Sequence, residues 1–157
     1  MKMVYCLYLI ALWGNNCTNK MLSTDINKII NYNHGHQNEI DLSSTDIQNI
    51  TNLLGQLTAG YENNVQLIIT DNRREHILNN DKCLEIYFNP QPMVKSDQGS
   101  EMKVNKVLLF LEGEFSSPPN QESCLFLLAD NRGYMGNVFN SPKGNKVIAQ
   151  LRNLLKI

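Results

Sequence analysis

The sequence lacks a surplus of charge of either sign. Its 14 lysine and arginine residues against 15 aspartate and glutamate residues give a formal net charge of -1 at pH 7. Nucleic-acid binding depends on clustered Lys and Arg side chains that contact phosphates. The nearest cluster is Lys143, Lys146, Arg152 and Lys156, on or beside a predicted helix, where cations near the C-terminus favour the helix dipole. The composition therefore predicts no nucleic-acid partner.

The sequence also lacks the motifs that mark many enzymes. It has no glycine-rich phosphate loop, no Gly-x-Ser-x-Gly segment, no His-Glu-x-x-His segment and no Cys-x-x-Cys pair. His34 and His36 would place two imidazoles on one side of an extended chain, but a zinc site needs three or four ligands and the only other histidine is His76. Two solvated histidines are the favoured interpretation. We therefore predict no catalytic residue, no metal and no cofactor.

The N-terminus has the pattern of an export signal. Residues 1–17 read MKMVYCLYLIALWGNNC, with Lys2, an apolar run from Met3 to Gly14, and then Cys17. The run is too short to cross a ~30 Å hydrocarbon core as a helix, but it has the length of the apolar part of a signal peptide. The segment resembles a bacterial lipoprotein signal peptide, a class in which the cysteine after the apolar run is lipidated. The alternative is that the run forms the first strand or helix of the fold.

The resemblance implies a division of the chain into three parts. Residues 1–16 would be a cleaved signal peptide, residues 17–38 a polar tether and residues 39–157 a single domain. Within the tether, Thr24 or Asp25 could cap about two helical turns that contain Ile26, Ile29 and Ile30. Lipidation at Cys17 would hold the protein at the cell envelope, facing the periplasm or the exterior. Its partners would then be the membrane, through the lipid, and another envelope protein.

Two helices and about five strands are predicted for the domain. Residues 44–59 have Ser43 or Ser44 as the potential cap, and residues 142–156 follow Ser141 with Pro142 at the first helical position; both segments have apolar residues at helical spacing. Between them lie β-branched and aromatic runs, separated by turn residues. The runs are 65–70, 83–88, 104–111, 124–129 and 134–139, with a further short one at 39–42. The order predicts an α+β fold: a mostly antiparallel sheet of about five strands with two helices packed on one face.

Two long loops, 89–103 and 112–123, are the predicted recognition segments, because loops on a rigid sheet can vary freely. The candidate binding residues on them are Met93, Lys95, Glu112, Glu114 and Phe115. With no catalytic motif present, the favoured function is a non-enzymatic binding module, for which an inhibitor or immunity role is one form. The alternative is an envelope hydrolase that uses Glu112 and Glu114, which are spaced by two and would point the same way in an extended chain.

Two cysteines lie on predicted strands of the domain. In an exported protein Cys83 and Cys124 could form a disulfide, although buried free thiols on strands are equally expected. A catalytic thiol at Cys83 with His76 seven residues upstream is the least favoured interpretation, because no nucleophile motif surrounds it.

Overall fold

The computed structural model describes residues 26–59, 61–96 and 98–157, so the predicted signal segment and Cys17 lie outside the described residues. Within them is a seven-stranded sheet in the order β2-β1-β4-β7-β8-β9-β3, in which all neighbouring strands are antiparallel. Its strands are β1 (Ile26–Asn33), β2 (His36–Glu39), β3 (Glu62–Ile68), β4 (Lys82–Phe88), β7 (Lys106–Glu112), β8 (Cys124–Asp130) and β9 (Gly133–Ser141). A separate hairpin pairs β5 (Met93–Lys95) with β6 (Glu101–Lys103), and the helices are α1 (Ser44–Thr58), α2 (Asp71–Asn80) and α3 (Gly144–Leu155).

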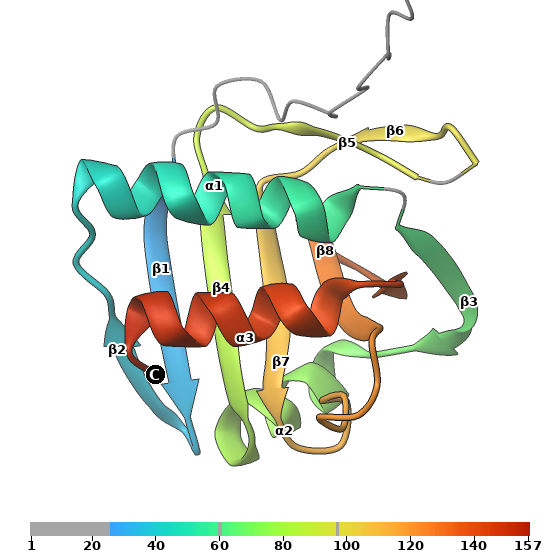
Figure 1. Ribbon diagram of the computed structural model, residues 1–157. Coiled ribbons are helices and arrows are strands. Elements are labelled where there is room, and N and C mark those ends of the chain that lie inside the picture. The colour runs from blue at the N-terminus through green and yellow to red at the C-terminus, as the bar shows by residue number, and fades with distance from the viewer. Residues whose placement is uncertain (1–25, 60, 97) are drawn as a thin grey trace, which may run out of the picture.

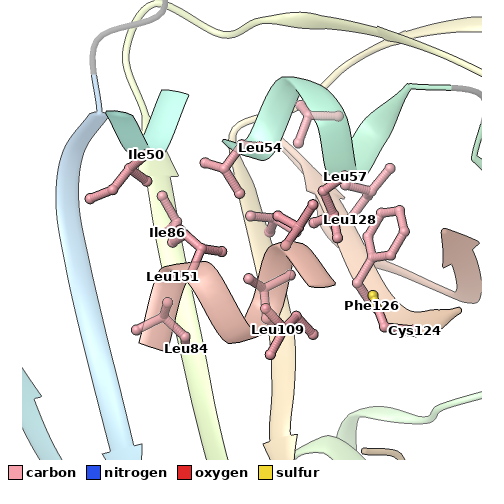
Figure 2. Close-up of a cluster of buried hydrophobic side chains, with 14 of the residues drawn as sticks. Ile50, Leu54, Leu57, Leu84, Ile86, Leu109, Cys124, Phe126, Leu128 and Leu151 are labelled. Carbon is pink, nitrogen blue, oxygen red and sulfur yellow. The ribbon is translucent and has the colours of Figure 1, made fainter. Parts of the chain in front are cut away.

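The main core lies between one face of the sheet and the helices α1 and α3, which run side by side across the strands (Figure 1). Figure 2 shows Leu54 and Leu57 of α1 and Leu151 of α3 among the side chains of the central strands. These three leucines have no exposed surface. The predicted α+β class and the packing of two helices on one face are confirmed, whereas the predicted strand number of about five is too low for the sheet.

The other face of the sheet carries α2 and a second core. Ile77 of α2 packs with Tyr32, Cys83 and Phe110, which point away from α1 and α3. This helix was not predicted from the sequence, because in its ten residues Ile77 alone is buried and no apolar stripe marks it. Its start is defined by Thr70, whose side-chain oxygen accepts a hydrogen bond from the Arg73 backbone N–H at 3.3 Å.

The predicted boundaries of the tether and of its helical turns are wrong. Residues 26–33, assigned to the tether, form β1, and residues 36–39 form its hairpin partner β2. Ile29 packs on the face covered by α1 and α3, whereas Ile30 and Tyr32 pack on the opposite face. A strand that is buried on both sides loses the simple alternation of apolar and polar residues, and a register shift after Ile26 adds to the helix-like spacing.

The start of α1 agrees with the prediction, and the start of α3 does not. Ser43 caps α1 through a reciprocal arrangement in which Ser43 and Asp46 each accept a hydrogen bond from the other's backbone N–H. Ser141, predicted as the cap of α3, is instead the last residue of β9 and is buried. The position before α3 belongs to Lys143, which makes no side-chain capping hydrogen bond.

The disulfide considered for Cys83 and Cys124 is not formed, since both are free buried thiols. The sheet separates them: Cys83 packs on the α2 face and Cys124 on the α1–α3 face. A disulfide needs the two Cβ atoms about 3.8 Å apart, and side chains on opposite faces of a sheet do not meet this requirement. Burial raises the pKa of each thiol to about 12, so neither supplies the thiolate that nucleophilic catalysis needs.

Candidate binding site

A cavity of about 540 Å³, here called the site cavity, lies between residues 113–123 and α3. Its lining combines apolar side chains with cations, side-chain amides and one carboxylate, that of Glu122. The lining residues are Phe110, Leu111, Ser117, Pro119, Asn120, Gln121, Glu122, Lys143, Asn145, Lys146, Ile148, Ala149 and Arg152. An apolar surface with a few polar groups at its margin is the usual composition of a ligand pocket.

One wall of the site cavity is the segment 113–123, which is held at both ends. Gly113 starts it with a φ of +113°, and a Cβ at this position would collide with the carboxylate of Asp81. Next, Phe115 packs on Phe110 with a ring-centroid distance of 5.5 Å, which ties the segment to the second core. Glu114 forms an ion pair with Arg73 of α2.

Asn145 in the first turn of α3 joins the two walls. Its side-chain N–H groups donate to the carbonyl oxygens of Pro118 at 3.0 Å and Gln121 at 2.7 Å. The Asn145 backbone N–H donates to the carbonyl oxygen of Glu122 at 3.0 Å. Three hydrogen bonds from one residue therefore fix the width of the cavity at this end.

The other wall, α3, approaches the sheet closely because Gly144 has no side chain. A Cβ at Gly144 would collide with the Sγ atom of Cys124 and lie 2.7 Å from Cβ of Ser141 and 3.0 Å from Cδ1 of Leu57. Substituting any larger residue would push the first turn of α3 away from β8, β9 and α1. The same turn carries the cations of the cavity.

Lys143 and Lys146 lie at the N-terminal end of α3, so the stabilisation expected for cations near a helix C-terminus does not apply to them. The helix dipole places partial positive charge at this end, so two cations there are electrostatically unfavourable, and no acidic residue occupies the first turn to offset them. Within the part of the chain that the structure describes, neither lysine has an ion-pair partner. Both are exposed at the margin of the cavity. The charge at this helix end lowers the stability of the folded protein and favours the binding of an anion there.

Of the predicted binding residues, three lie near this cavity. None of the five predicted residues lines it. Glu114 and Phe115 come before the lining residues of the segment 113–123, and Glu112, at the end of β7, accepts hydrogen bonds from Lys82 and from the lining residue Arg152, both at 2.9 Å. Hydrogen bonds from Lys82, followed by the charge of Lys82 and by Arg152, hold the pKa of Glu112 below its ordinary value. Glu112 and Glu114 thus have different cationic partners.

The structure does not bring Met93 and Lys95 to the same place. Both lie on β5, in the connection that joins Phe88 to Lys106. That connection is at one end of the sheet and the segment after Glu112 is at the other, since β4 and β7 are antiparallel and pair Tyr87 with Lys106 and Lys82 with Glu112 (Figure 1). The two predicted recognition loops therefore do not form one surface.

A second polar cluster surrounds Glu85 of β4, in the second core. The side chain of Glu85 accepts hydrogen bonds from the hydroxyls of Tyr32 at 2.9 Å, Tyr87 at 2.8 Å and Tyr134, and from Lys106 at 3.0 Å. Burial by itself would raise the pKa of Glu85, but hydrogen bonds from Tyr134, Tyr87 and Lys106 outweigh burial and lower it. Each hydroxyl faces a carboxylate, and burial together with Glu85 raises the pKa of all three tyrosines. Both carboxylate oxygens already accept two hydrogen bonds each, so Glu85 is poorly placed to act as a base.

Asn120, Gln121 and Asn145, and the place of Lys143 and Lys146 at the cavity, were not predicted from the sequence. Asn and Gln are frequent throughout the sequence, and nothing in the spacing distinguishes those that line a cavity. One signal was available for the lysines. Two cations just after a Ser-Pro helix start, with no acid nearby, contradict the usual preference for Asp and Glu in the first turn.

The described residues place two further limits on the site. Among them, no group of three or more His, Cys, Asp or Glu side chains is arranged to hold a metal ion. No helix within residues 26–59, 61–96 or 98–157 is long and apolar enough to cross a membrane.

No protein-family model, curated protein or solved structure matches the chain. The protein is therefore classified from its own structure. It is an α+β domain with helices on its sheet and, at one end of the sheet, a cavity whose lining includes three cations.

Proposed function

We propose that this protein is a non-enzymatic binding module whose site cavity accepts a ligand that carries carboxylate groups. The observation that carries the proposal is the pair Lys143 and Lys146: two exposed cations without ion-pair partners at the margin of a preformed cavity, where the helix dipole adds further positive potential. The apolar lining, including Pro119 and Ile148, would contact the remainder of the ligand.

The placement of the perturbed groups supports binding over catalysis. An acid–base site brings together groups with shifted pKa values in one concave pocket. Here the carboxylates with shifted pKa do not meet in one pocket. Glu85 accepts four hydrogen bonds in the second core, Asp130 pairs with Arg132 in the turn between β8 and β9, and Glu112, beside the site cavity, has its pKa lowered by Lys82 and Arg152. A hydrolase built on Glu112 and Glu114 has less support, because a general acid needs a raised pKa.

We further propose that the module is anchored at a cell envelope through a lipid on Cys17, as a surface or periplasmic protein. The position of Ile26 is consistent with this arrangement. Ile26 pairs with Phe88, so β1 begins at the end of the sheet opposite to Glu112 and the site cavity (Figure 1). A chain anchored upstream of Ile26 would hold the cavity away from the membrane.

Reversing the two charges tests the proposed site. Triglutamate is expected to bind the protein, and the Lys143→Glu/Lys146→Glu variant is expected to bind it at least about tenfold more weakly, because like charges then face each other. The matched control is Lys103→Glu/Lys156→Glu, which changes the net charge equally at exposed positions that do not line the cavity. Isothermal titration calorimetry measures both. Equal losses in the two variants would mean that net charge, not the cavity, attracts the peptide.

The anchor has its own test in a bacterial host. The full-length protein is expected to partition into the membrane fraction, with an intact mass that lacks residues 1–16 and includes acyl chains. Cys17→Ser is expected to abolish both properties. An unmodified, soluble, full-length wild type would contradict the anchor and leave the proposal for the cavity standing.

A further inference from the structure

A second cavity lies on the other flank of α3. It also measures about 540 Å³ and is lined by Gln56 and Ala59 of the α1 end, by Ser141 and Pro142 before α3, and by Lys143, Lys146, Val147 and Gln150. We call it the flank cavity. It shares two lining residues with the site cavity, and they are Lys143 and Lys146.

The two shared lysines form a ridge between the cavities. Residues three apart on a helix are neighbours on its surface, so Lys143 and Lys146 lie one above the other at the start of α3. On one side of the ridge α3 contributes Ala149 and Arg152, and on the other Val147 and Gln150. One ligand chain that crosses the ridge would enter both cavities and pass both cations.

Both cavities also contain side-chain amides. Asn120 and Gln121 line the site cavity, and Gln56 and Gln150 line the flank cavity; all four residues are exposed. An amide side chain both donates and accepts hydrogen bonds, which matches the alternating N–H and C=O groups of a peptide backbone. A fully ionised phosphate chain has acceptors alone, so it would pair with the amide N–H groups and leave the amide oxygens to water.

We propose, resting on the proposed function, that the ligand is an extended acidic segment of another polypeptide that lies across α3 and occupies both cavities. Its carboxylates pair with Lys143 and Lys146, and its backbone pairs with the amides on either side. A helix with its side chains is about 10 Å across and an extended residue spans about 3.3 Å. About three or four residues cross the ridge, and a segment of roughly eight reaches into both cavities.

Peptide length separates this inference from the proposed function. The test compares labelled triglutamate and octaglutamate by fluorescence anisotropy, with the full chain and with the variant Gln56→Glu/Gln150→Glu, which repels carboxylates from the flank cavity alone. Octaglutamate is expected to bind the wild type about tenfold more tightly than triglutamate, and the variant is expected to remove that advantage while changing triglutamate affinity less than about twofold. The matched control, Gln37→Glu/Gln48→Glu, adds the same charge at exposed positions outside both cavities.

Each of the other results of this binding experiment would contradict a particular step of the proposal. If octaglutamate binds no more tightly than triglutamate, or keeps its advantage in the variant, the extended ligand is wrong and the anionic site cavity stands. If a linear octaphosphate binds as tightly as octaglutamate, the assignment to a peptide is wrong. If neither peptide binds, the proposed function is wrong as well.

Discussion

Glu85→Ala is expected to lower the free energy of unfolding by about 3 kcal/mol. The side chain of Glu85 is 3% exposed, and its removal leaves Lys106 and three tyrosine hydroxyls without their acceptor. An unsatisfied hydroxyl in or beside the core is costly, and so is a partly buried cation that has lost its partner. Urea denaturation followed by circular dichroism measures the loss.

The matched control is Glu85→Gln, which keeps the shape and one acceptor oxygen but removes the charge. It is expected to cost roughly half as much as alanine, because amide and hydroxyl groups can still pair. Equal stability of Glu85→Ala and the wild type would show that the cluster contributes nothing to folding.

The same cluster predicts how stability depends on pH. Glu85 has a lowered pKa in the folded state, so its contribution is present above the ordinary glutamate value of about 4.3 and is lost as pH falls through the lowered value. The raised pKa values of Tyr32, Tyr87 and Tyr134 affect stability at high pH. Their contribution is present below about pH 10 and is lost as pH rises towards their folded-state values. The wild type is therefore expected to lose more stability than Glu85→Gln below about pH 4.

Gly144→Ala is expected to destabilise the fold by about 1–3 kcal/mol and to displace the start of α3. The added Cβ would collide with Cys124 and crowd Ser141 and Leu57. In most helices this substitution stabilises, because alanine has the higher helix propensity. A loss of stability, measured by thermal or urea unfolding, would therefore identify close packing as the cause.

The control for this prediction is the double variant Gly144→Ala/Cys124→Ala, which removes the Sγ atom that the new Cβ would meet. Cys124→Ala alone is expected to cost stability by leaving a small cavity. Together the two substitutions are expected to cost less than the sum of the separate effects, with a coupling of about 1 kcal/mol. Additive effects would contradict the predicted contact between these positions.

The parts of the fold that could be predicted from the sequence are those where the local signals agree. In α1, the capping residue Ser43 and the apolar face point to the same helix, and the structure agrees. The tripeptide Asp-Asn-Arg occurs twice and shows the limit of local signals. After Ala129 it turns into β9, helped by the Asp130 carboxylate, which accepts the Arg132 N–H, and by Gly133 with a φ of +117°. After Thr70, which can cap, the same tripeptide begins α2.

The site was less predictable than the fold, because it depends on contacts between distant segments. The sequence analysis chose the 112–123 loop as a recognition segment, and this loop forms one wall of the site cavity. The other wall could not be predicted, because it depends on two tertiary contacts. Gly144 allows α3 to lie against β8, and Asn145 donates hydrogen bonds to the loop. Lys143 was grouped with the cations near the C-terminus of the predicted helix, an interpretation that does not fit a residue at the helix start.

A titration of ¹⁵N-labelled protein with triglutamate, followed by two-dimensional NMR, tests the central claim most directly. The account predicts that the backbone amide signals of Lys143, Asn145 and Lys146 shift most, together with those of Asn120 and Gln121 across the cavity. Trilysine, the control with opposite charge, is expected to leave them unchanged. Shifts centred on the hairpin of Met93 and Lys95, or no saturable shifts at all, would contradict a carboxylate-binding cavity at the start of α3.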